Sequence, residues 1–448
     1  MFSYKQFGFI GGRSTVLQLL KVLDKWTEIL DSGGYVDIVY CDYMKAFDTV
    51  PHGRLATVME HYGIVDPILT WVKSFLSDRK QRVLVNGQAS SWHDVISGIP
   101  QGSVLGPVLF VIYINTLVDV VSDSEVAMFA DDTKMFKGIY NENDKCLLQQ
   151  DLNNIHDWSL HSLMRYHPEK TSAMQISTRN KCLPEPEYYM NNKRLNVSYE
   201  EKYLGVIIDS KLTFDKHISA KINKANSVMG IIRRTMEYMD EEIFRLLYTA
   251  MVRPHLEYAN PVWCPFLKKH INAIENVQRR ATRLVPGLAE LSYPERLRRL
   301  RLPTLSYRHY RGDMIEVFKI THGLYDRDVV KGFLPVRDKS DDANVLTRGH
   351  KYTLYKRHSN LNLRKFNFTY RVTDQWNCLP DHVVKCKTVR AFEAKLDSIW
   401  RDTDVMYDHE CDLSVLTTLR KLRSTNTNTD ASAQQCSTEF DTDLIQEA

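Results

Sequence analysis

Several features that would assign this chain to a common class are missing from its 448 residues. No apolar run approaches the roughly 18 residues of a membrane span, and the N-terminal MFSYKQFGF lacks the charged and then apolar layout of a signal peptide. The eight cysteines include no CxxC pair and no histidine at zinc-finger spacing, which indicates reduced thiols. We therefore expect an intracellular, non-secreted protein of the nucleus or cytoplasm that does not bind membranes.

The sequence also lacks a GxxxxGK[ST] loop, which weighs against a nucleotide hydrolase. Hydrophobic content of 43% and charged content of 25% are ordinary for a globular protein, and the length allows two or three domains. The net charge of +4 conceals an uneven distribution: residues 211–310 hold 18 basic and 9 acidic residues, whereas residues 402–448 hold 3 basic and 10 acidic residues. The basic middle favours a polyanionic partner; an ordinary solvated surface is the alternative.

Two adjacent carboxylates stand out in the stretch from Val126 to Phe136, VAMFADDTKMF. Two short apolar runs flank a tight turn that carries Asp131 and Asp132, a pattern typical of a β-hairpin. Because neighbouring like charges repel each other, their display at a strand tip indicates a bound cation. A merely solvated acidic hairpin is the alternative.

A third carboxylate ends another expected strand, Tyr35 to Tyr43, which is rich in β-branched and aromatic residues. Asp42 lies at its carboxyl end, on the same face as Ile38 and Tyr40. It is either an N-cap for a following helix or a neighbour of the acidic hairpin. In the second case, three carboxylates would hold two Mg²⁺ ions, which prefer oxygen ligands.

Three motifs follow one another along the chain: D-x-x-K-A-F-D beginning at Asp42, SGIPQGSVLGPVLF around Gly98 to Gly106, and FADD ending at Asp132. In kind and in order they resemble the palm of a reverse transcriptase of the non-LTR (LINE-type) retrotransposons. The resemblance covers roughly residues 6–287. It implies an RNA-directed DNA polymerase that adds dNTPs to a primer 3′-hydroxyl by two-metal nucleotidyl transfer.

The resemblance also implies an α+β fold with a right-hand polymerase palm, an antiparallel sheet with packed helices. The expected parts are partial fingers (1–34), palm (35–210), helical thumb (211–288), an α-helical C-terminal region (289–400) and an acidic, largely disordered tail (401–448). The finger strands that usually precede the first helix in this family are not found in the sequence. We therefore expect an N-terminally truncated polymerase with reduced activity.

Roles for individual residues follow from the resemblance. It assigns metal binding to Asp42, Asp131 and Asp132, with two Mg²⁺ ions or Mn²⁺ in their place, and proton donation to the leaving pyrophosphate to Lys170. The remaining expected contacts are phosphate for Arg13, sugar exclusion for Phe47, nucleotide and template base for Gln101 and Gly102, and primer grip for Tyr203, Leu204 and Gly205. The alternative roles are a helix-end surface residue for Arg13, a surface lysine for Lys170, a core residue for Phe47 and a glycine loop that merely packs for Gln101 and Gly102.

The implied partners are an RNA template, a DNA primer or target, and dNTPs; the sequence does not predict an oligomeric state. An alternative from another class is an inactive polymerase remnant that only binds RNA or RNA–DNA duplex. An RNA-dependent RNA polymerase is disfavoured by Phe47, because an aromatic ring under the sugar excludes a 2′-hydroxyl.

Overall fold

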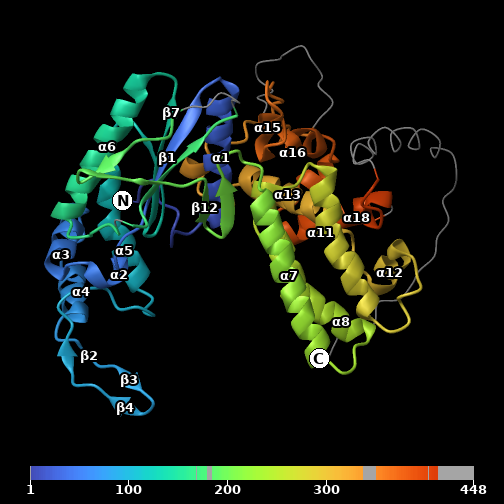
Figure 1. Cartoon of the computed structure of the whole chain (residues 1–448), viewed down its shortest axis with the longest axis horizontal. Helices are drawn as coiled ribbons and strands as arrows, with labels where there is room; N and C mark the ends of the chain where they lie inside the picture. Colours follow the sequence, from blue (N-terminus) through green and yellow to red (C-terminus); the bar gives the residue numbers. More distant parts are fainter. Residues whose placement is uncertain (1, 168, 179–183, 337–349, 402, 412–448) are drawn as a thin grey trace, which may run out of the picture.

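The computed structural model describes residues 2–167, 169–178, 184–336, 350–401 and 403–411. Helices and a mainly antiparallel sheet are combined in one chain, as expected for an α+β fold (Figure 1). Of the acidic tail expected after residue 400, residues 412–448 lie outside the described part. The segment just before them is packed in place, because the backbone carbonyls of Val405 and Met406 accept hydrogen bonds from Thr304.

A five-stranded sheet forms the centre of the N-terminal half, in the order β11-β8-β1-β7-β6. All of its pairings are antiparallel except β11 with β8. Its strands are β1 (Tyr35–Cys41), β6 (Glu125–Phe129), β7 (Asp132–Ile139), β8 (Ser172–Ile176) and β11 (Asn196–Val197).

Strand β1 is buried on both faces, which explains its nearly continuous apolar sequence. Ile38 and Tyr40 point into a core that is shared with α1 and the C-terminal helices. Val39 and Cys41 point into a second core, formed with the helices that follow β1 and with α6. The sheet therefore separates two hydrophobic cores.

In the described part of the N-terminal half, seven helices accompany the sheet. The sequence offers Ser14 or Thr15 as the N-cap of helix α1, and the structure has Ser14, whose hydroxyl accepts a hydrogen bond from the amide of Leu17. These helices are α1 (Thr15–Asp31), α2 (Ala46–Thr49), α3 (His52–His61), α4 (Ile68–Leu76), α5 (Gly106–Ile114), the 3₁₀ helix η1 (Asn115–Val120) and α6 (Glu142–His161).

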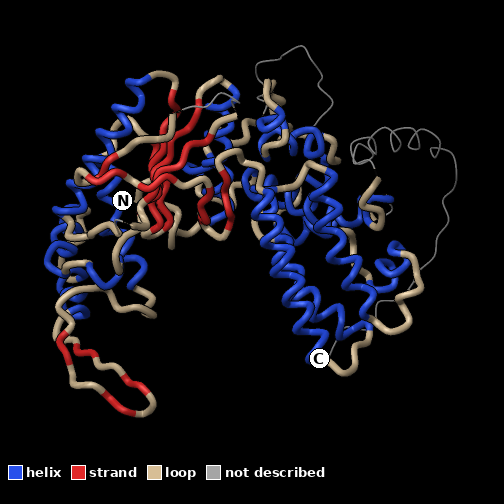
Figure 2. The backbone as a smooth tube through the Cα atoms, viewed as in Figure 1, coloured by secondary structure: helices blue, strands red, loops and turns tan. Residues whose placement is uncertain are grey.

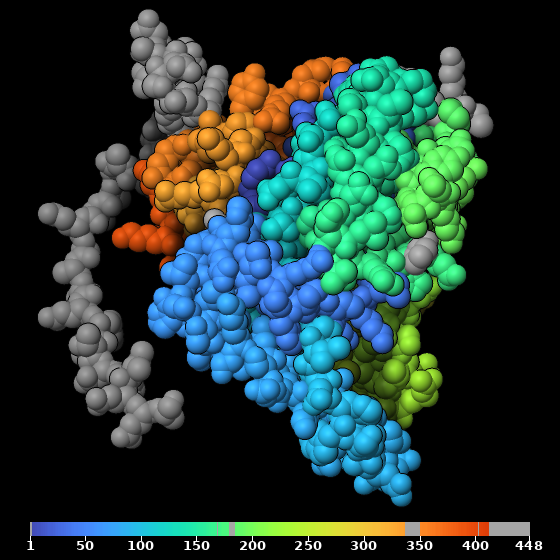
Figure 3. Space-filling view, turned by 90° about the vertical axis from the view of Figure 1, so that its left-hand side faces the viewer, coloured from blue at the N-terminus to red at the C-terminus, as the bar shows by residue number. Residues whose placement is uncertain are grey.

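Short two-stranded hairpins extend this half of the molecule. They comprise β2 (Lys80–Gln81) with β5 (His93–Asp94), β3 (Leu84–Val85) with β4 (Gln88–Ala89), β9 (Tyr189–Met190) with β10 (Lys193–Arg194), and β12 (Glu200–Tyr203) with β13 (Val206–Asp209). The segment that carries β2 to β5 projects from the body (Figure 3).

The C-terminal half is helical (Figure 2). Its elements are α7 (Asp215–Thr235), α8 (Glu241–Leu247), the π-helix η2 (Tyr248–Val252), α9 (Arg253–Glu257), α10 (Asn260–Trp263), α11 (Lys268–Ala281), η3 (Thr282–Leu284), α12 (Tyr293–Leu300), α13 (Leu305–Thr321), α14 (Arg327–Val330), α15 (Asn362–Lys365), α16 (Phe368–Asn377), α17 (Asp381–Val384), α18 (Val389–Trp400) and η4 (Asp404–Met406).

Helix α1 joins the two halves, because it packs on the sheet and also on α10, α15 and α16. The ion pair between Arg364 and Asp24, 2.6 Å long, lies in this junction, and the arginine side chain is almost fully buried. The amides of Asn360 and Leu361 bond the carboxylate of Asp31 at the other end of α1. The first helix of the chain is thus held by the last third of the chain.

The sequence patterns predict a strand over residues 202–209, a helix over residues 151–164 and a helix over residues 104–117, and each differs in detail from the structure. The strand expected over residues 202–209 is the β12–β13 hairpin, because Leu204 and Gly205 both take positive φ and form its turn. The helix expected at residue 151 already begins at Glu142, where Asn141 and Asp144 form a capping box. The helix expected over residues 104–117 begins at Gly106 and becomes 3₁₀ at Asn115.

Candidate active site

Strand register brings the predicted carboxylates of two distant segments together. Cys41 at the end of β1 pairs with Thr133 of β7. Continuing that register by one residue places Asp42 opposite Asp132, and Cα atoms of facing residues in an antiparallel pair lie about 4.5–5.5 Å apart. Asp131 is the residue before Asp132, in the turn between β6 and β7.

The turn that carries Asp131 is fixed by a side chain from the start of the chain. Phe129 pairs with Asp132, so Ala130 and Asp131 alone make the turn, and Ala130 takes a φ of +56°. The fully buried carboxamide of Gln6 accepts a hydrogen bond from the Ala130 amide (2.9 Å) and donates one to the Ala130 carbonyl (3.3 Å). These two bonds hold a backbone conformation that an alanine rarely adopts.

Gly8 allows this close approach of the N-terminal segment. A Cβ atom added at Gly8 would lie 2.3 Å from the backbone nitrogen of Ala130. Any larger residue at position 8 would therefore push the segment away from the turn.

Arg13 holds the N-terminal segment that includes Gln6, and it does not lie among the predicted carboxylates. Its guanidinium donates to the carbonyls of Ser3 and Gln6 and forms an ion pair with Asp326, 2.7 Å long. The Arg13 side chain is only 6% exposed. The structure thus gives this residue internal partners and does not bring it to the other predicted site residues.

The carboxylates carry negative charge that the protein only partly compensates. Desolvation, followed by the charge of Asp42, raises the pKa of Asp131. Desolvation, followed by the charges of Asp131 and Asp42, raises the pKa of Asp132. Lys170 Nζ lies 3.4 Å from Asp42 Oδ2, and the charge of Lys134 partly offsets the raised pKa of Asp132. The amide of His167, three residues before Lys170, donates a hydrogen bond to the Asp42 carbonyl and so holds this segment beside Asp42.

This donor set suits a divalent cation. Carboxylate oxygens are the ligands that Mg²⁺ and Mn²⁺ prefer. Besides desolvation, the charge of Asp42 raises the pKa values of both Asp131 and Asp132, so a cation placed among these carboxylates would relieve their repulsion. Within the residues that the structure describes, no three acidic, imidazole or thiol side chains are yet gathered as a closed ligand cage. Asp42 is turned toward Lys170 instead.

Phe47 and Gln101 flank the carboxylate strand on the helix α2 side. The Phe47 ring is stacked on Phe110 of α5, with ring centroids 4.2 Å apart, and is only partly buried. Gln101 is exposed and donates a hydrogen bond to Asp48 Oδ1 (3.0 Å). Gly102, next to it, has a φ of +82° and open space around its Cα. Gln101 thus contacts the segment that follows Asp42, and Gly102 is next to Gln101 in the chain.

The predicted primer-grip residues lie at the β12–β13 turn: Tyr203 ends β12, and Leu204 and Gly205 form the turn. Lys134, two residues after Asp132, is fully buried, and its Nζ lies 3.5 Å from the centre of the Tyr203 ring. Burial lowers the pKa of Lys134 well below its usual range. The Tyr258 hydroxyl bonds the carbonyl of Leu204, and its ring would lie 2.9 Å from a Cβ atom at Gly205.

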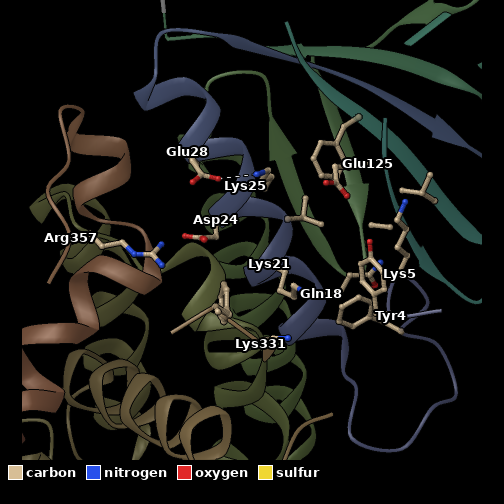
Figure 4. A pocket seen from close by; sticks show the side chains of 17 residues that line it. Tyr4, Lys5, Gln18, Lys21, Asp24, Lys25, Glu28, Glu125, Lys331 and Arg357 are labelled. Carbon is tan, nitrogen blue, oxygen red and sulfur yellow. Dashed lines mark hydrogen bonds and ion pairs between the residues drawn. The ribbon is translucent and has the colours of Figure 1, made fainter. Parts of the chain in front are cut away.

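A separate cavity of about 390 Å³ lies beside α1 and contains none of the predicted site residues (Figure 4). Charged side chains of α1, among them the ion pair between Lys25 and Glu28, line one wall, and Lys331 and Arg357 approach from the C-terminal half. The cavity marks the junction of the two halves of the chain.

Sequence patterns alone did not identify Gln6, Gly8, Lys134 or Asp326 as part of this arrangement. For Gly8, its place in a glycine-containing N-terminal stretch is a sequence signal for a close backbone contact. Gln6 and Asp326 act on residues more than 100 positions away, 124 and 313 respectively. No local pattern encodes such contacts.

The part of the chain that contains the predicted site residues is similar to known proteins. Residues 1–208 match the family model described as reverse transcriptase (RNA-dependent DNA polymerase). The RNA-directed DNA polymerases from mobile element jockey of Drosophila funebris and Drosophila melanogaster are 29% and 30% identical to it over 298 residues, 63% of this chain. The chain spans about a third of their length (32%).

Among solved structures, apo telomerase from Candida tropicalis is similar over 66% of this chain and 50% of that chain, with 11% identity and a TM-score of 0.38. None of the helices in the described part of the chain combines the length and apolar character needed to cross a bilayer.

Proposed function

We propose that this chain, whose residues 1–208 match the reverse transcriptase family model, copies RNA into DNA. Its substrates would be an RNA template, a DNA primer and dNTPs. In this proposal residues 35–210 are the palm, residues 211–288 the thumb and residues 1–34 a part of the fingers. The reaction joins the primer 3′-hydroxyl to the α-phosphate of a dNTP and releases pyrophosphate.

Asp42, Asp131 and Asp132 are the proposed metal ligands. Two bound Mg²⁺ ions would make the primer hydroxyl more acidic and neutralise charge on the triphosphate. Rotation of Asp42 away from Lys170 toward Asp131 would complete the ligand set. Lys170 would then be free, close to the site, to donate a proton to the leaving pyrophosphate.

The remaining proposed roles follow from position around these carboxylates. The Phe47 ring, fixed by stacking on Phe110, would lie under the sugar and exclude a 2′-hydroxyl. Gln101 and Gly102 would contact the nucleotide and the template base. The turn of Tyr203, Leu204 and Gly205 would hold the primer end.

One observation carries this proposal: the pairing of Cys41 with Thr133, which brings the next residue, Asp42, beside the Asp131–Asp132 turn that Gln6 holds in place. A copying enzyme needs carboxylates from two strands at one point, and preorganised placement is the main contribution that a protein makes to phosphoryl transfer.

Primer extension on an RNA template with Mg²⁺ tests the proposal. We expect Asp131→Ala to abolish nucleotide incorporation while circular dichroism and binding to an RNA–DNA hybrid stay unchanged. Asp119→Ala is the matched control, because Asp119 is an exposed aspartate in η1. Extension by Asp131→Ala would refute the assignment. Hybrid binding without any extension by the unaltered protein would favour the inactive remnant.

A further inference from the structure

A groove of about 1120 Å³ lies in the C-terminal half, away from the carboxylates. One wall is the start of α11 and the residues just before it, and the other runs from Lys356 through α16. None of the residues proposed for catalysis or primer binding lines this groove.

The groove has an excess of positive charge. Lys268 and Lys365 line it, and no described acidic side chain lies within 4.0 Å of their charged nitrogens. Arg357 lines both this groove and the cavity beside α1. The other lining cations are compensated, because Lys356 pairs with Asp374 and the buried Arg371 pairs with Asp313. Glu410 is the one further acidic residue of the lining.

Aromatic rings accompany these cations. Phe266, which precedes α11, is 44% exposed. It is stacked on Phe366, which follows α15, with centroids 4.5 Å apart and planes inclined by 4°. Tyr370 of α16 also lines the groove. The rings and cations come from both walls, so a ligand in the groove would touch the two together.

We propose that this groove binds single-stranded nucleic acid. Cations that follow a phosphate backbone, combined with exposed aromatic rings on which bases stack, are the two components of sequence-independent single-strand binding. A duplex would satisfy the cations but keep its bases away from Phe266. Neutral polar side chains of the lining, such as Asn272, Ser359 and Gln375, supply hydrogen bonds to sugars and phosphates.

The groove is separate from the proposed catalytic residues, and the assignment of its ligand as template or displaced strand rests on the proposed function. RNA and DNA share the phosphates and bases that the groove recognises. Two probes therefore distinguish them: fluorescein-labelled oligo(U) and oligo(dT) of about 12 nucleotides, a length within the usual site size.

The experiment measures fluorescence anisotropy of each probe with the full chain, over a series of salt concentrations, while an unlabelled RNA–DNA hybrid in saturating excess occupies the proposed catalytic site. For Lys268→Gln/Lys365→Gln we expect the slope of log K against log salt to fall by about 1.4, since each lost phosphate contact contributes roughly 0.7. Lys387→Gln/Arg390→Gln is the matched control, because both residues are exposed in the same region outside the groove.

Phe266→Ala tests the aromatic component separately. We expect about tenfold weaker binding with an unchanged salt slope, because stacking contributes no counterion release. Complete displacement of the probe by the hybrid would overturn the proposal, as would groove variants that behave like the control. Preferential binding of an acidic peptide would assign the groove to a protein segment. Loss of primer extension alone would bear on the catalytic proposal and not on this groove.

Discussion

The carboxamide of Gln6 bonds both backbone polar groups of Ala130, the residue next to Asp131. The contact joins the first residues of the chain to the turn that presents the proposed metal ligands. Because Ala130 has a positive φ, the turn without Gln6 would relax toward more favourable backbone angles. The position of Asp131 therefore depends on a residue far from it in the sequence.

We expect Gln6→Ala to lower the rate of primer extension by about 10- to 100-fold, since a displacement of roughly 1 Å costs that much in an oriented site. The affinity for an RNA–DNA hybrid should change little. Steady-state extension kinetics with varied dNTP check this.

Gln149→Ala provides the matched control for Gln6→Ala. The Gln149 carboxamide bonds the amide and carbonyl of Tyr189 in the same two-sided manner, both at 2.8 Å, on a different hairpin. An equal loss of extension in both variants would show that the Gln6 effect is one of general stability.

Arg13 and Asp326 should act on the same turn through Gln6. Arg13 donates to the Gln6 carbonyl while Asp326 holds the guanidinium. We expect Arg13→Ala and Asp326→Asn each to reduce extension, and the effect of Arg13→Ala to be largely lost when Gln6→Ala is already present. A double-mutant cycle on the extension rate measures this coupling. Strictly additive effects would contradict a shared pathway. The exposed pair Lys385–Asp381 serves as a control.

Much of the fold could be predicted because its signals are local. The β1 strand, the acidic hairpin and the α1 helix each show their own periodicity, and Ser14 caps α1 as its sequence indicates. Helix α4 has the bounds that its apolar pattern predicts, Ile68 to Leu76. Such features depend on neighbours within a few residues.

The supports of the site could not be predicted, since they are tertiary contacts. Arg13 lies just before helix α1, which predicts a phosphate contact. Its ion-pair partner, Asp326, comes from the other half of the chain. Lys134 looks like a surface lysine in an alternating strand; its place between Trp26 and Tyr203 appears only once α1 and the β12–β13 hairpin are packed together.

Phe47 is expected to control the choice of sugar. Phe47→Ala would open the space beneath the nucleotide and admit ribonucleotides, while Phe110→Leu, which removes only the stacking partner, should weaken the discrimination less. Competition between dNTP and rNTP in single-nucleotide extension gives the ratio of kcat/KM values. Unchanged selectivity in Phe47→Ala would show that another residue excludes the 2′-hydroxyl.

Glu275 makes the stability of the helical half depend on pH. Burial raises the pKa of Glu275 to about 7 from an ordinary value near 4.5, although Tyr293 and the Leu305 amide bond its carboxylate. Between these two values the folded protein keeps a proton that the unfolded chain has lost. Stability should therefore fall as pH rises from 4.5 to 7 and stay level above it, by up to about 3 kcal/mol.

The variant Glu275→Gln tests the origin of this pH dependence. An amide cannot ionise, so the decline in melting temperature between pH 5 and pH 7 should become shallower, and the variant should gain most relative to the unaltered protein at pH 8. Glu290→Gln, at an exposed glutamate just beyond α11, should leave the profile unchanged. Parallel profiles for Glu275→Gln and the unaltered protein would mean that the buried carboxylate is already ionised at neutral pH, with Tyr293 and Leu305 supplying enough hydrogen bonding to offset its burial.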